Sequence, residues 1–231
     1  MDWNELWSQP LSGVALTVAL YAAASVAGRR YRRLHPLLLC SCSLIAVLIV
    51  FDIPYESYNK GGSLISFLLG PATVALAVPL YRHWRTIRSQ WRPIVIGVVS
   101  GAAFSLAANA WLAYAFGGSR ELLLTMLPKS TTAPIAIELV RMYGGIPELG
   151  AVFTVLTGLL GSLVGVSFLR LIGVKGDLPI GIAIGTAAHG IGTARVLRDS
   201  ELQGAYAGLA MGLTGVIMSV LSVPIYYWLI R

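Results

Sequence analysis

The segment 123–137, LLTMLPKSTTAPIAI, decides the fold class of this 231-residue chain. It interrupts an apolar run of membrane-spanning length with Lys129, three consecutive hydroxyl residues and two prolines. An ionisable group inside a membrane is costly, so it is usually kept for a pathway, a ligand or a buried partner. Prolines break helical hydrogen bonding, which the membrane interior tolerates only inside protein or beside a water-filled cavity. Because the freed N–H groups and the positive helix end favour an anion, the segment predicts a transport site for a small anion.

The composition independently indicates a membrane protein. Hydrophobic residues make up 56% of the chain and charged residues 12%, with a mean hydropathy of +0.75, whereas soluble domains carry about 25% charged residues. We therefore predict an all-α integral membrane protein that forms one membrane domain over residues 1–231. The first apolar run, Leu11 to Ala27, follows an acidic segment and is expected to be a retained helix rather than a cleaved signal. Cys40 and Cys42 point to different helix faces, so we expect neither a disulfide nor a metal site.

The net charge of +7 is concentrated in two short basic loops, 29–34 and 82–92. Basic loops at the ends of apolar runs are typical of cytoplasmic loops in membrane proteins. Trp84 and Trp91 fit anchoring at the membrane interface. No nucleic-acid-binding motif accompanies the charge, so we expect no nucleic-acid partner.

The order of apolar runs predicts six crossings and two broken hairpins. Eight full crossings would place Arg170 and Lys175 outside, against the charge rule. If segments 121–140 and 178–194 instead re-enter from outside and inside respectively, most basic residues fall inside. Eight spanning segments remain the alternative. The runs lie at about 11–28, 35–52, 62–81, 93–116, 121–140, 148–172, 178–194 and 203–230.

An internal repeat supports the hairpins. At a shift of 54 residues, ten identities occur across 35 positions without a gap, beginning with Thr132 on Thr186 and including Arg141 on Arg195. Composition alone would give roughly three. Each unit, 120–172 and 177–230, would be a hairpin followed by a spanning helix, which makes the second copy inverted. Residues 1–116 would form the N-terminal helices, a scaffold for the repeat; chance agreement of glycine spacing is the alternative.

Two further segments resemble interrupted helices. LLGPATVALAVPLY at 68–81 contains Gly70, Pro71 and Thr73, so it either opens the backbone beside a hydroxyl or simply kinks a packing helix. GTAAHGIGTAR at 185–195 places His189 among small residues at the repeat position of the lysine segment. A buried packing histidine is the competing interpretation, as a lysine snorkelling to the surface is for Lys129.

The other polar residues indicate packing more than chemistry. Glu138 and Arg141 are spaced to pair with each other, and Asn109 is expected to make an interhelical hydrogen bond. Glycine pairs at the spacing of close helix contacts indicate packing or dimerisation. They are Gly97/Gly101, Gly161/Gly165 and Gly208/Gly212. Nucleophile–base sets, carboxylate pairs and metal-ligand spacings are missing from the sequence, so we expect no enzyme, cofactor or metal.

The three strings LLGPATVALAVPLY, LPKSTTAPIAIE and GTAAHGIGTAR, in this order, resemble the LrgB/CidB family, which includes the plastid glycolate/glycerate translocator. The resemblance runs from about residue 10 to the end. It implies either a carrier of small monocarboxylates or a holin/antiholin-like regulator of murein hydrolase export and autolysis, with a small membrane partner of the LrgA/CidA type. It also implies a bacterial inner-membrane location. The family often has Ser-His where this chain has Ala188-His189.

The residues favour the carrier, because a lytic pore needs an amphipathic lining rather than a single cation between unwound, hydroxyl-rich segments. We expect a proton-coupled transporter of glycolate, glycerate or pyruvate, working as a homo-oligomer with a dimer favoured. His189, and Glu138 as a second candidate, would carry the proton. The substrate site would comprise Lys129, Ser130, Thr131, Thr132, Thr73, Thr186 and His189, and the opened backbone Gly70, Pro71, Pro128, Pro134, Gly185, Gly190 and Gly192.

Overall fold

The computed structural model describes residues 7, 9–30, 36–75 and 77–230. Across these ranges the chain is helical and contains no strand, and the structure is 86% helical. It divides into two compact units, unit 1 up to Ala75 and unit 2 from Leu76 onward. The basic residues Arg32 and Arg33 of the first predicted cytoplasmic loop lie outside the described residues.

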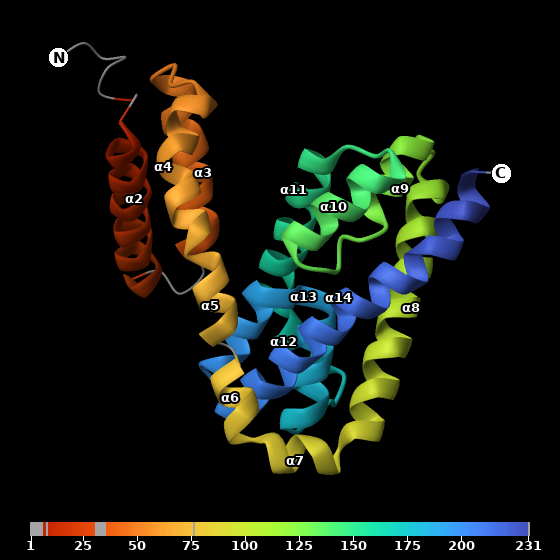
Figure 1. The fold of residues 1–231 in the computed structure, drawn as a ribbon. Helices are drawn as coiled ribbons and strands as arrows, with labels where there is room; N and C mark the ends of the chain where they lie inside the picture. The colour runs from red at the N-terminus through yellow and green to blue at the C-terminus, as the bar shows by residue number, and fades with distance from the viewer. Residues whose placement is uncertain (1–6, 8, 31–35, 76, 231) are drawn as a thin grey trace. The chain divides into compact units, whose positions relative to one another are not determined.

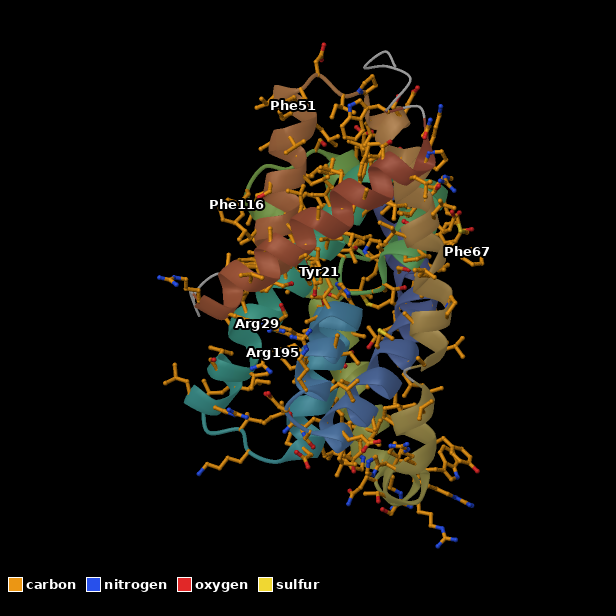
Figure 2. The ribbon with its side chains drawn as sticks, turned by 90° about the vertical axis from the view of Figure 1, so that its left-hand side faces the viewer. Tyr21, Arg29, Phe51, Phe67, Phe116 and Arg195 are labelled. Atoms are coloured by element: carbon orange, nitrogen blue, oxygen red, sulfur yellow. The ribbon has the colours of Figure 1, made fainter. Side chains whose placement is uncertain are left out.

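Six helical stretches of the described chain are long and apolar enough to cross a membrane. They are Pro10–Arg30, Tyr55–Arg82, Trp91–Ala115, Pro147–Leu171, Asp177–Leu197 and Glu201–Tyr227, and a shorter apolar helix covers Pro36–Val50. Large apolar side chains cover the outside of these helices; Phe67 and Phe116, for example, are 76% and 85% exposed (Figure 2). Lipid is a suitable environment for such a surface, and water is not. The predicted all-α integral membrane fold is confirmed.

Unit 1 contains α2 (Pro10–Arg30), α3 (Pro36–Val50), α4 (Tyr55–Phe67) and α5 (Leu69–Ala75), with α2 packed on α3 and α4 (Figure 1). Glycines let α2 and α4 approach closely. A Cβ atom on Gly61 would lie 2.8 Å from the Cα of Gly13, so neither position has room for a side chain. Thr17 and Tyr58 add a hydroxyl–hydroxyl bond of 3.1 Å across the same contact. α4 and α5 are separated at Leu68, so the helix is interrupted just before Gly70 and Pro71.

Unit 2 holds the remaining helices (Figure 1). α8 packs against α13 and α14 here, although the sequence grouped residues 93–116 with the N-terminal helices. The elements are α6 (Ala77–Arg82), α7 (Trp84–Ser89), α8 (Trp91–Ala115), α9 (Arg120–Met126), α10 (Ala133–Tyr143), α11 (Pro147–Leu160), a π-helix η1 (Gly161–Gly165), α12 (Val166–Leu171), α13 (Asp177–Leu197) and α14 (Glu201–Ile230).

The segment predicted as the first broken hairpin, 121–140, consists of two short helices. α9 has 7 residues and α10 has 11, and six residues separate them. A helix needs about 20 residues to cross a membrane, so neither helix can cross alone. The interruption falls on the predicted residues Pro128 to Thr132.

The second predicted hairpin is confirmed by a reversal inside α13. His189 has φ 37° and ψ −134°, which is not helical. A Cβ atom on Gly192 would lie 2.5 Å from the Cβ of Ala188 and 2.8 Å from the side chain of Ile184. In a straight helix residues 184 and 192 would be about 12 Å apart along the axis. The chain therefore folds back at His189, and α13 is a hairpin even though its 21 residues are enough, by number, to cross.

Helix boundaries recur at the shift of 54 residues found in the sequence. α10 ends at Tyr143 and α13 ends at Leu197; α11 begins at Pro147 and α14 begins at Glu201. The two segments thus share one order, an interrupted helical segment, a short connection and a long helical stretch, and their assignment as repeat units stays a prediction. The relative inversion of the two copies stays a prediction.

Small residues allow the first arm of α13, residues 177–188, to pack closely against its neighbours at the centre of unit 2. On one side, Gly97 and Gly101 of α8 leave space that Ile182 and Thr186 occupy. Gly161 of η1 leaves space for Ala188. The predicted pairs Gly97/Gly101 and Gly161/Gly165 therefore serve packing within the chain, whereas a Cβ atom on Gly212 would meet no atom within 4 Å. α13 is the most buried of the six candidate spans, and it lies among α8, α12 and α14 (Figure 1).

Candidate functional site

The loop between α9 and α10 is built by its own polar groups. The Pro128 carbonyl accepts two hydrogen bonds from Thr131, one from the N–H at 3.0 Å and one from the hydroxyl at 2.8 Å. The Lys129 N–H donates to the Met126 carbonyl at 3.3 Å. Thr131 is 1% exposed, and its hydroxyl makes its hydrogen bond within the loop. Thr131 therefore stabilises the conformation of the loop. Its predicted contact with substrate would require that bond to be exchanged.

The start of α10 presents unused N–H groups beside Lys129. Thr132 is the N-cap, but its hydroxyl makes no capping bond, and Pro134 stands in the first turn. Within the described chain, the N–H groups of Thr132, Ala133 and Ile135 donate to no backbone carbonyl. Such groups, with the helix dipole behind them, form an anion-binding position. Lys129 is half-buried, and none of the ion pairs among the described residues includes it.

α8 holds this loop from the other side. Ser105 bonds the buried Ser130 hydroxyl at 2.7 Å, and Asn109 donates to the Met126 carbonyl at 3.4 Å. The interhelical role predicted for Asn109 is confirmed. Ser105 was missed in the sequence, although its position four residues before Asn109, on the same face of an apolar helix, was the signal that could have revealed it.

The side chain of His189 forms a hydrogen bond between the turn of the second hairpin and α11 of the first repeat unit. Its Nε2 atom lies 2.8 Å from the carbonyl oxygen of Thr154 in α11, and the imidazole is 5% exposed. Because a carbonyl only accepts, Nε2 carries the proton in this bond. The two residues singled out from the sequence, Lys129 and His189, both lie in unit 2, each at an interruption of a helical segment.

A further polar side chain of α13, that of Thr186, makes no hydrogen bond. Its side chain is 6% exposed, and its hydroxyl oxygen is buried without a hydrogen-bond partner. Burying a hydroxyl unpaired costs free energy, so such a group calls for an explanation. Its position one turn before His189 makes it a candidate for a ligand contact.

The glycines of the second hairpin permit close packing and the reversal. Gly185 lies against the backbone of Ala207 in α14, where a Cβ atom would be 2.7 Å from the Ala207 Cα. Gly192 packs back on Ala188 and Ile184. Gly190 follows the reversal and has open space around it, with the sulfur of Met211 as its nearest contact at 3.8 Å.

Several predicted residues are not brought to this loop by any described contact. Glu138 forms an ion pair with Arg141 at 2.6 Å, and both side chains are more than half exposed. This pairing agrees with the structural interpretation of the i,i+3 spacing. Gly70, Pro71 and Thr73 lie on α5 in unit 1, and their part in a site with Lys129 stays a prediction.

Two cavities of unit 2 lie where the hairpins begin. One, of about 410 Å³, is lined by Arg120, Glu121 and Tyr143, among others. The second, of about 360 Å³, lies beside Lys175 and Asp177. Neither is lined by Lys129 or His189.

The chain matches the model of the LrgB-like family over residues 17–229. It is 38% identical to the protein YxaC of Bacillus subtilis over 218 residues, which are 94% of each chain. It is 36% identical to the holin-like protein CidB of Staphylococcus aureus over 215 residues, covering 92% of this chain and 94% of the relative. No solved structure matches.

Proposed function

This chain belongs to the LrgB-like family, and we propose that it is a secondary transporter of small monocarboxylates such as glycolate, glycerate or pyruvate. The observation that carries the proposal is the presence of two interrupted helical segments with polar groups: Lys129 stands at the break of one, and the buried His189 stands at the reversal of the other. Paired broken segments that carry polar groups are typical of secondary transporters.

The carboxylate would bind Lys129 together with the free N–H groups at the start of α10. A cation next to unused backbone donors matches the two oxygens of a carboxylate. The substrate's hydroxyl or keto oxygen would contact Thr132, Ser130 or Thr186, of which Thr186 has a buried hydroxyl without a partner. Thr131 would act through the loop.

His189 would carry the coupled proton. A histidine changes charge in the physiological pH range, and binding an anion beside Lys129 would favour the protonated imidazole. Protonation would place a second donor on the ring while leaving the Nε2 bond to Thr154 intact. Alternating access would come from movement of the two hairpins against the other helices.

A holin-like function is the second candidate, and the comparisons favour it by name. The matched Staphylococcus proteins are called holin-like protein CidB. On this proposal the chain would act in the bacterial inner membrane with a small LrgA/CidA-type partner, form large oligomers and control murein hydrolase export. The basic loops 29–34 and 82–92 would face the cytoplasm in either case.

Uptake into proteoliposomes separates the two functions. The purified chain alone is reconstituted, and entry of radiolabelled glycolate, glycerate and pyruvate is followed with and without a pH gradient. Saturable, mutually competed uptake that is lost in Lys129→Met but kept in the control Lys60→Met, an exposed lysine of α4, supports the carrier.

Two results would count against the carrier. Uptake that is unchanged in Lys129→Met would exclude the proposed site. Leakage of unrelated dyes, or flux only after an LrgA-type protein is added, would favour the holin-like function.

A further inference from the structure

The cavity of about 360 Å³ beside α13 is a polar site apart from the Lys129–His189 region. It is lined by Arg170 from the end of α12, by Lys175 in the following loop, by Asp177 at the start of α13 and by Gln203 in α14. Arg170 and Lys175 make none of the ion pairs found among the described residues. The cavity therefore offers two free cations and one carboxylate.

Gln203 adds a buried acceptor with a fixed direction. Its Nε2 donates to the Asp177 carboxylate at 2.8 Å, and the side chain is 7% exposed. Because a carboxylate only accepts, the amide cannot be turned round, so its Oε1 must point elsewhere. That Oε1 is buried and has no hydrogen-bond partner. A buried acceptor without a partner in a cavity wall can accept a hydrogen bond from a donor that enters the cavity.

We propose that this cavity binds a phospholipid headgroup that carries both a phosphate and a primary ammonium group, as phosphatidylethanolamine does. The phosphate would bind Arg170 and Lys175, as two unpaired cations favour. The ammonium would lie by Asp177 and donate one hydrogen to the Gln203 Oε1, which satisfies the unpaired acceptor.

The surroundings favour a lipid over a soluble zwitterion. Phe168, Leu171 and Ile172, next to Arg170, are exposed by 57%, 83% and 58%. Phe168 and Leu171 end the 25-residue candidate span Pro147–Leu171 and Ile172 follows it, so these side chains lie at the edge of the lipid-facing surface. Acyl chains can therefore follow the protein from the cavity mouth.

Native mass spectrometry of the whole chain, equilibrated with equal amounts of phosphatidylethanolamine and phosphatidylcholine, tests the proposal. Phosphatidylcholine is the matched probe, because its quaternary ammonium has the same charge and no N–H donor. We expect about a tenfold preference for phosphatidylethanolamine, the typical effect of one hydrogen bond to a charged group. Equal retention of the two lipids would overturn the proposal.

Substitutions test whether this cavity causes the preference for phosphatidylethanolamine over phosphatidylcholine. Asp177→Asn keeps an acceptor for Gln203 and should bring the ratio of phosphatidylethanolamine to phosphatidylcholine retention close to one. Lys175→Gln, in an exposed loop, should weaken the retention of both lipids. Arg88→Gln in α7, a basic residue outside the cavity, is the control and should change nothing. Unaltered lipid retention in Lys175→Gln would contradict a lipid site here. Equally strong retention of soluble phosphoethanolamine would contradict it as well.

Discussion

Replacing Gly158 by alanine should dislodge the imidazole of His189. A Cβ atom at this position would lie 2.6 Å from the Cε1 of His189, 3.1 Å from its Nε2 and 3.1 Å from the Cδ1 of Ile191. The ring cannot stay where it is, and its bond to the Thr154 carbonyl must lengthen or break. The substitution therefore tests whether the hairpin turn is seated on α11.

The expected loss of stability follows from three terms. Overpacking a tight site costs about 1–3 kcal/mol. Losing a hydrogen bond to a buried group costs about 1–3 kcal/mol. Alanine in place of glycine inside a helix returns about 1 kcal/mol. The net destabilisation is about 1–5 kcal/mol, and for a chain of this size each kcal/mol lowers the melting temperature by about 2–4 °C.

The control is Gly212→Ala, at the corresponding position of the second repeat unit. No heavy atom lies within 4 Å of a Cβ atom built there, so only the gain in helix propensity remains. Thermal unfolding of both variants in one detergent, followed by uptake in proteoliposomes, gives the comparison. Equal melting temperatures and equal uptake would refute the placement of His189 against α11.

Two further substitutions test the packing around the site, each by thermal unfolding. Gly185→Ala would place a Cβ atom 2.7 Å from the Ala207 Cα, a backbone atom that cannot turn aside, so we expect a loss of at least about 3 kcal/mol; a stable variant would show that α13 and α14 do not approach so closely. Asn109→Ala removes the bond to the Met126 carbonyl and should cost about 1–3 kcal/mol, whereas an unchanged melting temperature would exclude this tie between α8 and the lysine loop.

Local chemistry made the first hairpin predictable. Pro128 and Pro134 cannot complete a helix, and a lysine with three hydroxyls marks an interruption that lipid would not tolerate. The reversal at His189 was harder to foresee, because the segment contains no proline near the turn. There the distribution of basic residues, supported by the repeat, carried the prediction rather than any signal at the turn itself.

Tertiary packing was not visible in the sequence. Nothing in the pattern of α8 showed that it would lie against α13, since its glycines fit either packing or dimerisation. The hydrogen bond between Ser105 and Ser130 also depends on which helices meet. A cavity such as that beside Gln203 is likewise formed by three separate elements and leaves no periodic signal.

The burial of α13 has a consequence for how the chain is made. α13 is the least apolar of the six candidate spans, and much of its surface is covered by α8, η1 and α14. The last of these is synthesised after it. A nascent chain that stops near residue 198 therefore lacks the partner that shields Gly181 and Gly185, and we expect its second hairpin to stay accessible to protease until α14 emerges. Assembly of the centre of unit 2 would then wait for α14, which covers α13 when it inserts.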